Sequence, residues 1–301
     1  MLQLSDALLG TILATTASLM FAFQYLFVRL GTREGSVSEV IWVSLLSNVV
    51  ILVPPALVLY DVSMSTEALL AFAGAGLSGS LFARICMFTS IERLGASRTS
   101  PIVASNALFA TLLAVVVLDE SLTAVHFLGV VLIVAGVAVI SYETAESQRV
   151  EVSRRELALL FFVPILGAVF LGIEPIFISL ALGAGGSIIP GTAVVVTTAF
   201  IGFTVYTRAT TGLPSPSIVR QPYMKWYIAA GVATTFGLLA AFTALQTAPV
   251  VIAVPLIQTS PLLVIGLSAL FLSSRLERVT PAVLVSTVII ILGATIVSLS
   301  G

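Results

Sequence analysis

Charged residues are scarce in this chain of 301 residues. Asp, Glu, Lys and Arg together make up 9% of it, against about 25% in a typical soluble domain, while apolar residues account for 58%. A soluble protein with so few charges would have little to keep its surface hydrated, so the composition favours a chain that lies in lipid. The net charge of −1 argues against the strong positive field that binds nucleic acid.

Cysteine and histidine are almost absent. Cys86 is the one cysteine, so no disulfide forms within the chain, and His126 is the one histidine. These counts exclude metal sites built from clusters of Cys or His and disfavour a His-based catalytic triad. We therefore expect neither a metal nor a cofactor. His126 begins an apolar run, where we expect it to be exposed and without a role.

Ten apolar runs are long enough to cross a membrane as helices. A spanning helix needs about 20 apolar residues, because the hydrocarbon core is about 30 Å thick and a helix rises about 1.5 Å per residue. The polar segment 143–156 separates a first half, 1–142, from a second half, 157–301. The sequence predicts an all-α integral membrane protein with spans at 6–30, 38–60, 66–91, 97–118, 123–142, 157–182, 187–208, 224–247, 249–273 and 280–299.

The cations gather on one face of the predicted bundle. When loops are assigned to alternating faces, all of the 13 Lys and Arg residues except Arg84 fall on the same face. Cytoplasmic loops of membrane proteins carry such an excess of cations. We therefore expect a multi-pass protein of the cell membrane, with its basic loops and the 143–156 linker in the cytoplasm and both termini outside.

The two halves resemble each other in sequence. A shift of 154 residues places Pro101 on Pro255, and after a three-residue insertion a shift of 157 places Glu120 on Glu277. An odd number of helices in each half makes the second half enter the membrane upside down, and the basic loops accordingly change position within the repeat. The sequence predicts two inverted five-helix repeats around a central cavity, as in many secondary transporters.

This pattern resembles the EamA-type permeases of the drug/metabolite transporter superfamily. Their repeats typically show a Pro-Leu-rich helix, an acidic Gly-Glu-Arg-Leu-Thr-like hairpin and a helix with spaced glycines. Segments 261–263 and 276–280 match in the second half, and segment 118–123 matches in the first, where Ala107 and Asp119 replace the usual Pro and Gly. The resemblance covers essentially the whole chain and implies a cavity lined by helices 1, 3, 4, 6, 8 and 9.

Two charged residues lie inside predicted spans, Glu174 and Arg84. Charges in hydrocarbon are costly, so those that persist are functional candidates. A carboxyl group removed from water tends to hold a proton, which would let Glu174 exchange a proton for a cationic or zwitterionic solute. Arg84 would bind a carboxylate or phosphate group. The alternatives are pairing of each residue with a polar neighbour and, for Arg84, extension of the side chain to the membrane surface. The predicted depths of Glu174 and Arg84 in the membrane differ by roughly 12 Å, which disfavours a direct ion pair between them.

Three uncharged residues join them as expected substrate- or ion-binding residues, Gln24, Asn106 and Gln258. The implied cavity helices favour these three over Asn48, which lies near the middle of the second span. The alternative for each is a hydrogen bond between helices, worth about 0.6 kcal/mol in membranes.

Four prolines are expected to break or gate helices. Pro101 and Pro255 occupy equivalent places in the two halves, close to Pro261, and Pro175 follows Glu174 directly. Proline removes a backbone donor and clashes with the preceding turn. Interruptions at corresponding places of two halves point to a transporter site.

The sequence therefore predicts a secondary active transporter that moves a small metabolite, such as an amino acid or an amphiphilic cation or zwitterion, by alternating access, with proton coupling through Glu174. A membrane-embedded enzyme and a passive channel are the alternatives. No Gly-rich nucleotide-binding motif is present, so ATP is not expected to drive transport. The expected partners are a small solute, protons and the bilayer, without nucleic acid, and the expected state is a monomer, with a dimer as the alternative.

Overall fold

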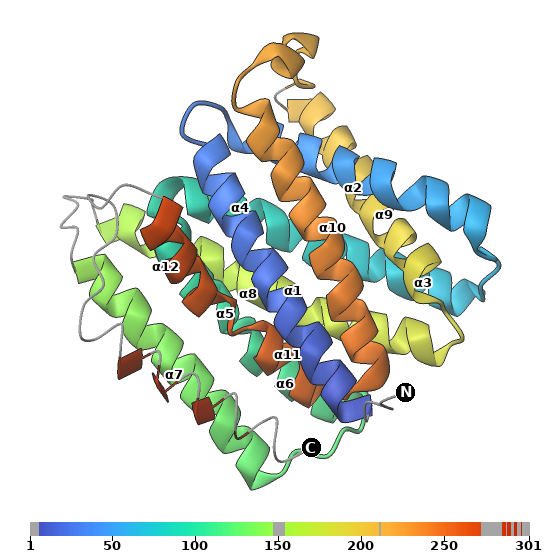
Figure 1. Ribbon diagram of the computed structural model, residues 1–301, viewed down its shortest axis with the longest axis vertical. Helices are drawn as coiled ribbons and strands as arrows, with labels where there is room; N and C mark the ends of the chain where they lie inside the picture. Colours follow the sequence, from blue (N-terminus) through green and yellow to red (C-terminus); the bar gives the residue numbers. More distant parts are fainter. Residues whose placement is uncertain are drawn as a thin grey trace.

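The computed structural model describes residues 6–146, 154–210 and 212–271, together with 285–286, 288–289, 292–293 and 296. These residues form helices and short connections, with no strand among them (Figure 1). The elements are α1 (Asp6–Gly31), α2 (Val37–Leu59), α3 (Thr66–Ala75), the π-helix η1 (Gly76–Ala83), α4 (Arg84–Leu94), α5 (Ala96–Ala104), α6 (Asn106–Val117), α7 (Ala124–Glu146), α8 (Arg154–Gly183), α9 (Ile188–Thr210), the 3-10 helix η2 (Pro216–Arg220), α10 (Met224–Thr247), α11 (Val250–Ile257) and α12 (Ser260–Phe271).

Seven of the ten predicted spans are confirmed as helices long and apolar enough to cross a membrane. Two others are helical but hold shorter apolar stretches, Ile102–Val117 and Ala124–Gly136. The tenth predicted span, 280–299, lies largely outside the described residues. The seven are Leu8–Gly31, Val37–Leu59, Thr66–Leu94, Phe162–Gly183, Ile188–Thr210, Met224–Thr247 and Val250–Phe271.

Large apolar side chains are exposed on the outside of the bundle. Val58, Val116 and Leu270 are 79%, 78% and 80% exposed. The polar residues of the spans point inward instead, and Ser44, Asn48 and Gln24 are among those buried. Such a surface suits lipid, in which exposed apolar groups are well solvated and polar groups must find partners inside the protein.

Both ends of the predicted linker 143–156 are helical. α7 continues to Glu146 and α8 begins at Arg154, while 147–153 lie outside the described residues. Polar residues do not by themselves end a helix, because a helix that extends past the hydrocarbon keeps its backbone hydrogen bonds in water.

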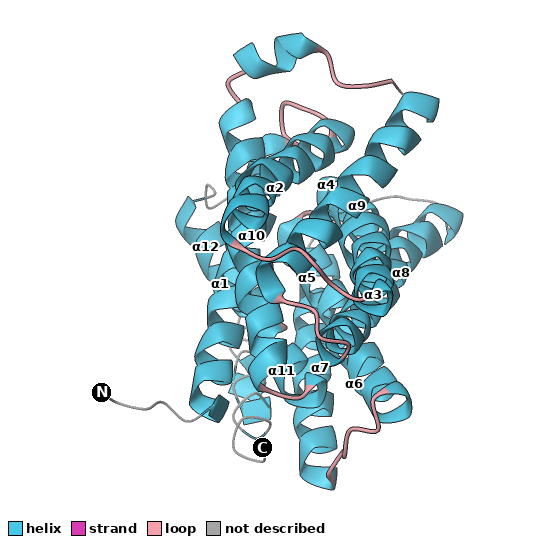
Figure 2. Ribbon diagram, turned by 90° about the vertical axis from the view of Figure 1, so that its right-hand side faces the viewer, coloured by secondary structure: helices cyan, strands magenta, loops and turns pink. Residues whose placement is uncertain are grey.

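The two halves of the chain pack against each other reciprocally. α1 packs along α10, and in matching fashion α3, η1 and α4 pack along α8 (Figures 1 and 2). α2 and α9 contact each other. Glycines permit some of these close approaches: at Gly186 and Gly191 a Cβ atom would overlap the ring of Phe72. The first helix of each half, α1 or α8, therefore packs against helices of the other half.

Two helices are broken at equivalent places. α5 and α6 meet at Ser105, whose N–H and hydroxyl donate to the Ile102 carbonyl at 3.2 and 2.7 Å. The break between α11 and α12 repeats this arrangement: the N–H and hydroxyl of Thr259 donate to the Leu256 carbonyl at 3.2 and 2.8 Å. The positions differ by the 154 residues of the sequence repeat. α5 packs against α12 and α6 against α11, so the two broken helices run antiparallel.

Prolines precede both breaks by one turn. Pro101 lies in α5 and Pro255 in α11. The amide four residues after each proline, that of Ser105 or Thr259, donates to the carbonyl of the residue that follows the proline instead of to the carbonyl of the proline. Pro261 is the second residue of α12, where a helix needs no N–H donor. Its counterpart Ala107 occupies the same place in α6, so the break does not depend on this proline.

The helix break predicted at Pro175 is not present, because α8 continues through this residue to Gly183. The proline ring still leaves the carbonyl of Leu171 without its usual intrahelical donor. Membrane helices tolerate such prolines where neighbouring groups or a cavity satisfy the freed carbonyl. Leu171 and Pro175 both line the central cavity described below.

Candidate functional site

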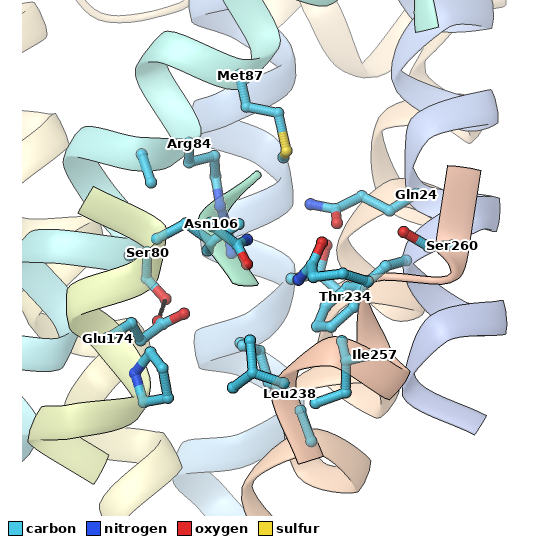
Figure 3. A pocket seen from close by; sticks show the side chains of 18 of the residues that line it. Gln24, Ser80, Arg84, Met87, Asn106, Glu174, Thr234, Leu238, Ile257 and Ser260 are labelled. Atoms are coloured by element: carbon cyan, nitrogen blue, oxygen red, sulfur yellow. Dashed lines mark hydrogen bonds between the residues drawn. The ribbon is translucent and has the colours of Figure 1, made fainter. Parts of the chain in front are cut away.

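A cavity of about 100 Å³ lies between the interlocked halves (Figure 3). It is smaller than the roughly 300–1,000 Å³ of pockets for drug-sized ligands, and it has room for several water molecules or a small solute. Side chains from α1, η1, α4, α6, α8, α10, α11 and α12 line it. All five residues expected to bind substrate or ions are among them: Gln24, Arg84, Asn106, Glu174 and Gln258.

Glu174 is held against the π-helix η1. Its side chain is 6% exposed, and its Oε1 accepts a hydrogen bond from the Ser80 hydroxyl at 3.1 Å. The carboxyl group also lies directly over Gly79, where a Cβ atom would overlap it. π-helical turns are rare and often occur at functional sites. Here the π-helical turn places the Ser80 hydroxyl and Gly79, which has no side chain, next to the Glu174 carboxylate.

Arg84 is held by Asn48, a residue that does not line the cavity. Nη1 of Arg84 donates to Oδ1 of Asn48 at 3.0 Å, and Arg84 is 4% exposed. The Nδ2 atom of Asn48 donates in turn to the Gly231 carbonyl at 2.6 Å and to the Thr235 hydroxyl at 2.8 Å. Asn48 therefore joins α2, α10 and α4 and fixes the direction of Arg84.

The charged residues share one wall of the cavity. Arg84 and Glu174 lie on the same side in Figure 3, and Gln24 faces them from the other side. Among the described residues the two charges form no ion pair with each other, because each is hydrogen-bonded to a different partner. The cavity thus presents a positive and a negative group at separate places opposite a neutral, hydrogen-bonding wall that includes Thr234 and Ser260.

Asn106 is the first residue of α6, at the first helix break. It is 1% exposed, and neither its Nδ2 nor its Oδ1 has a hydrogen-bond partner among the described residues. A buried amide is costly when its donors and acceptor are unused. Since Asn106 lines the cavity, both groups are available to a molecule inside it. Gln258 contributes a second amide from the matching break.

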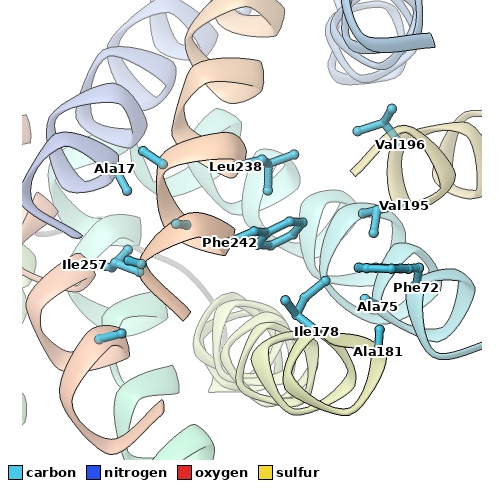
Figure 4. Packing of buried hydrophobic residues seen from close by; sticks show 14 of the residues in the cluster. Ala17, Phe72, Ala75, Ile178, Ala181, Val195, Val196, Leu238, Phe242 and Ile257 are labelled. Carbon is cyan, nitrogen blue, oxygen red and sulfur yellow. The ribbon is translucent and has the colours of Figure 1, made fainter. Parts of the chain in front are cut away.

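The apolar part of the cavity wall belongs to the main hydrophobic core. Leu238, Phe242 and Ile257 line the cavity and pack into the cluster that also contains Phe72 and Ile178 (Figure 4). The apolar wall of the cavity is therefore continuous with the packed interior. The mixture of apolar surface and a few placed polar groups is typical of small-molecule sites.

The groups that line the cavity are suited to binding a polar solute. Within the described ranges, no group of three or more His, Cys, Asp or Glu residues is placed to hold a metal ion. The cavity offers one cation, one carboxylate, amides and hydroxyls, which form hydrogen bonds and ion pairs with a solute.

Sequence reasoning missed Ser80, Gly79 and Asn48 as supports of the two charges. The small residues of segment 76–80, Gly-Leu-Ser-Gly-Ser, were a signal in an otherwise bulky run. The expectation that His126 is exposed is wrong, since it is 5% exposed. Thr123 accepts a hydrogen bond from the His126 amide at 3.2 Å, so the residue lies within the first turn of α7. His126 is on the buried side of this turn, whereas Val125 and Phe127 are exposed.

Comparison with known proteins confirms the resemblance for the first half of the chain. The sequence model of the EamA-like transporter family matches residues 8–142. No curated protein matches the chain, whereas 28 chains of solved structures do. One of these, a crystal structure, has a TM-score of 0.75 over 97% of this chain and 96% of its own, at 13% identity, a likeness that shows the fold alone. The match over the first half and the apolar helices of spanning length lead to one conclusion: this chain is similar to the EamA-like transporters over residues 8–142 and has the helices of a multi-pass membrane protein.

Proposed function

We propose that the chain is a secondary active transporter that carries a small metabolite through the central cavity by alternating access. The observation that supports this best is the convergence of five polar residues from distant parts of the chain on one buried cavity. Polar groups in a membrane interior are expensive, so a cavity that collects them is expected to bind a polar solute. The unused amide of Asn106 gives such a solute a partner.

The proposal includes ten spans arranged as two inverted repeats. The matched breaks at Ser105 and Thr259 and the antiparallel packing of the broken helices support this arrangement. The reciprocal contacts of α1 with α10 and of α8 with α3 support it independently. Transport would then result from rocking of one half against the other about the cavity.

The proposed orientation in the cell membrane follows from the cations. Both termini lie outside, and the basic loops lie in the cytoplasm. In this orientation the end of the bundle with Arg29 and η2 faces the cytoplasm, and the hairpin between α6 and α7 faces outward. Arg29 donates to the carbonyls of Ile91 and Glu92, which ties the cytoplasmic ends of α1 and α4 together.

The substrate class we propose is a small solute that carries charge, such as an amino acid or an amphiphilic cation or zwitterion. Glu174 offers a site for a cationic group and Arg84 a site for an anionic one. Glu174 also serves as the coupling residue, because it binds a proton or a cationic substrate in exchange. Ser80 donates to its charged form and holds it in place.

The test begins with a thermal-shift screen of metabolites on the purified protein, because a bound ligand raises the melting temperature. Solutes that pass are then assayed for flux in proteoliposomes with and without a proton gradient. Saturable uptake that responds to the gradient supports the proposal. Chemical conversion of the solute would show an enzyme, and unsaturable flux would show a channel; either result would overturn it.

A further inference from the structure

A second cavity, of about 510 Å³, lies beside the first at the end of the bundle where α6 and α10 end and α11 begins. We call it the vestibule, and its lining includes Glu120, Ser179, Leu182, Leu245, Gln246 and Thr247. Polar side chains form much of this lining, so the vestibule suits water and a dissolved solute. In the proposed orientation it opens to the outside of the cell.

Leu245 separates the vestibule from the central cavity. Of the residues that the structure describes, it is the one that lines both spaces. Its half-buried side chain packs against two hydrophobic clusters, one with Phe242 and the other with Ile176 and Val254. The one described residue that the two spaces share is therefore an apolar side chain that lies between them.

Glu120 fixes the position of the chain that follows Leu245. Its Oε1 accepts from the Val250 amide at 2.9 Å and its Oε2 from the Val251 amide at 3.0 Å. A carboxylate on the first amides of a helix satisfies donors that have no partner in the helix. The hairpin of the first half thus holds the start of α11 in the second half, at the rim of the vestibule.

We propose that Leu245 is the gate between the vestibule and the central cavity, and that the Glu120 contact keeps this gate closed. The inference rests on the proposed transport function, and it adds the route by which a solute reaches the cavity from the outer side. Opening requires that the end of α10 and the start of α11 move away from the α6–α7 hairpin. Such a movement connects the central cavity to the vestibule and leaves the residues that bind the solute in place.

The test uses cysteine accessibility, because Cys86 is the one native cysteine and is replaced by Cys86→Ala. Thr234→Cys reports on the cavity and Gln246→Cys on the vestibule. Sealed vesicles are treated on each face with a small, membrane-impermeant sulfonated thiol reagent, and labelling rates are measured. Labelling after denaturation and size-exclusion profiles check that each variant is intact, and Ser260→Cys is a second cavity reporter.

We expect Leu245→Ala to speed labelling of the cavity cysteine through the vestibule about tenfold or more, because truncation of a packed Leu commonly weakens the packed state by at least that factor. Leu245→Trp should slow it. The rate at Gln246→Cys should stay the same. The matched control is Leu239→Ala, which removes the same atoms from a half-buried site on α10 that lines neither space.

An unchanged cavity rate in Leu245→Ala, or an equal increase in Leu239→Ala, would overturn the gate. Labelling of Gln246→Cys from the cytoplasmic face would instead overturn the proposed orientation, and the gate would then be judged by the same comparison on that face. Absence of transport in proteoliposomes concerns the proposed function, since the labelling rates do not depend on flux.

Discussion

Ser80 donates a hydrogen bond to Glu174 over 3.1 Å, from the π-helix of the first half to α8 of the second. The acid that carries the coupling proposal is therefore held by a residue that precedes it by 94 positions in the chain. Any movement between the halves changes this contact. If Glu174 has the proposed coupling role, proton binding at this acid is linked to the relative position of the halves.

Glu174→Gln should remove the pH dependence of transport. The amide keeps a group that accepts from Ser80 but cannot exchange a proton. We expect transport to become independent of pH and folding to change by no more than about 1 kcal/mol. Proteoliposome flux at a series of pH values measures this, with Glu39→Gln, in the capping box of α2, as the control. A pH profile that persists in Glu174→Gln would rule out the coupling role.

Gly79→Ala should displace the Glu174 carboxyl group. A Cβ atom at this position would overlap the carboxyl group, so either the acid or the π-helix must shift. We expect a loss of transport of about tenfold or more, as commonly follows a displacement of about 1 Å in a binding site. Gly183→Ala is the control, because a Cβ atom there meets no atom within 4 Å. Equal flux in the two variants would argue against the importance of this contact.

Asn106→Leu should weaken solute binding without weakening the fold. Its amide has no partner among the described residues, so an apolar side chain of similar shape removes a buried polar group at no loss of hydrogen bonds. We expect an unchanged or higher melting temperature, with a gain of up to about 1–3 kcal/mol, and loss of the solute-induced shift.

Thr111→Val provides the comparison for this variant. Thr111 is buried in the same helix with its hydroxyl unpartnered in the described structure, but it does not line the cavity. The valine variant should keep the solute-induced shift in full. Loss of that shift in both variants would indicate a general effect on α6 instead of a contact with the solute.

Asn48→Ala should destabilise the protein and release Arg84. The change removes three hydrogen bonds, to Arg84, Gly231 and Thr235. We expect a loss of about 1–3 kcal/mol in thermal unfolding in detergent, because the buried guanidinium group is left without this partner. Ser47→Ala, which removes a hydroxyl bonded within α2 itself, should change stability little. Equal melting temperatures for the two variants would contradict the proposed support of Arg84.

Glu120→Gln should loosen the start of α11. The change removes the negative charge at the helix N-terminus and one of the two acceptors for Val250 and Val251. We expect a loss of stability of about 0.5–2 kcal/mol and faster labelling of a cavity cysteine through the vestibule. The neighbouring change Asp119→Asn removes an equal charge from an exposed residue and should alter neither measurement.

The spans could be predicted from the sequence because hydrocarbon thickness fixes the length of an apolar run. The ends of α1, α2, α9 and α10 lie within two residues of the expected positions. The internal geometry of the runs could not be predicted in this way. Segments 66–91 and 97–118 were expected as single helices, whereas they contain a π-helix and a break, which depend on packing against the other half.

The five polar residues of the cavity could be found because charge and amide groups are conspicuous in apolar spans. Their supports could not, since Ser80 and Gly79 matter through one contact each with a residue far along the chain. Asn48 was not expected to bind substrate, because its helix was not among those predicted to line the cavity. Its role follows from three hydrogen bonds that sequence spacing does not reveal.

The short rods on either side of the helix breaks constrain how the protein is made. α6 has 12 residues and α11 has 8, so at about 1.5 Å per residue they measure about 18 and 12 Å, well short of the hydrocarbon thickness. Neither helix can lie alone in lipid with the backbone polar groups at its broken end exposed. α6 and α11 pack against each other instead. We therefore expect that the walls of the cavity are completed only after the second half of the chain has been synthesised. A chain truncated between the two halves should be degraded rather than accumulate in the membrane.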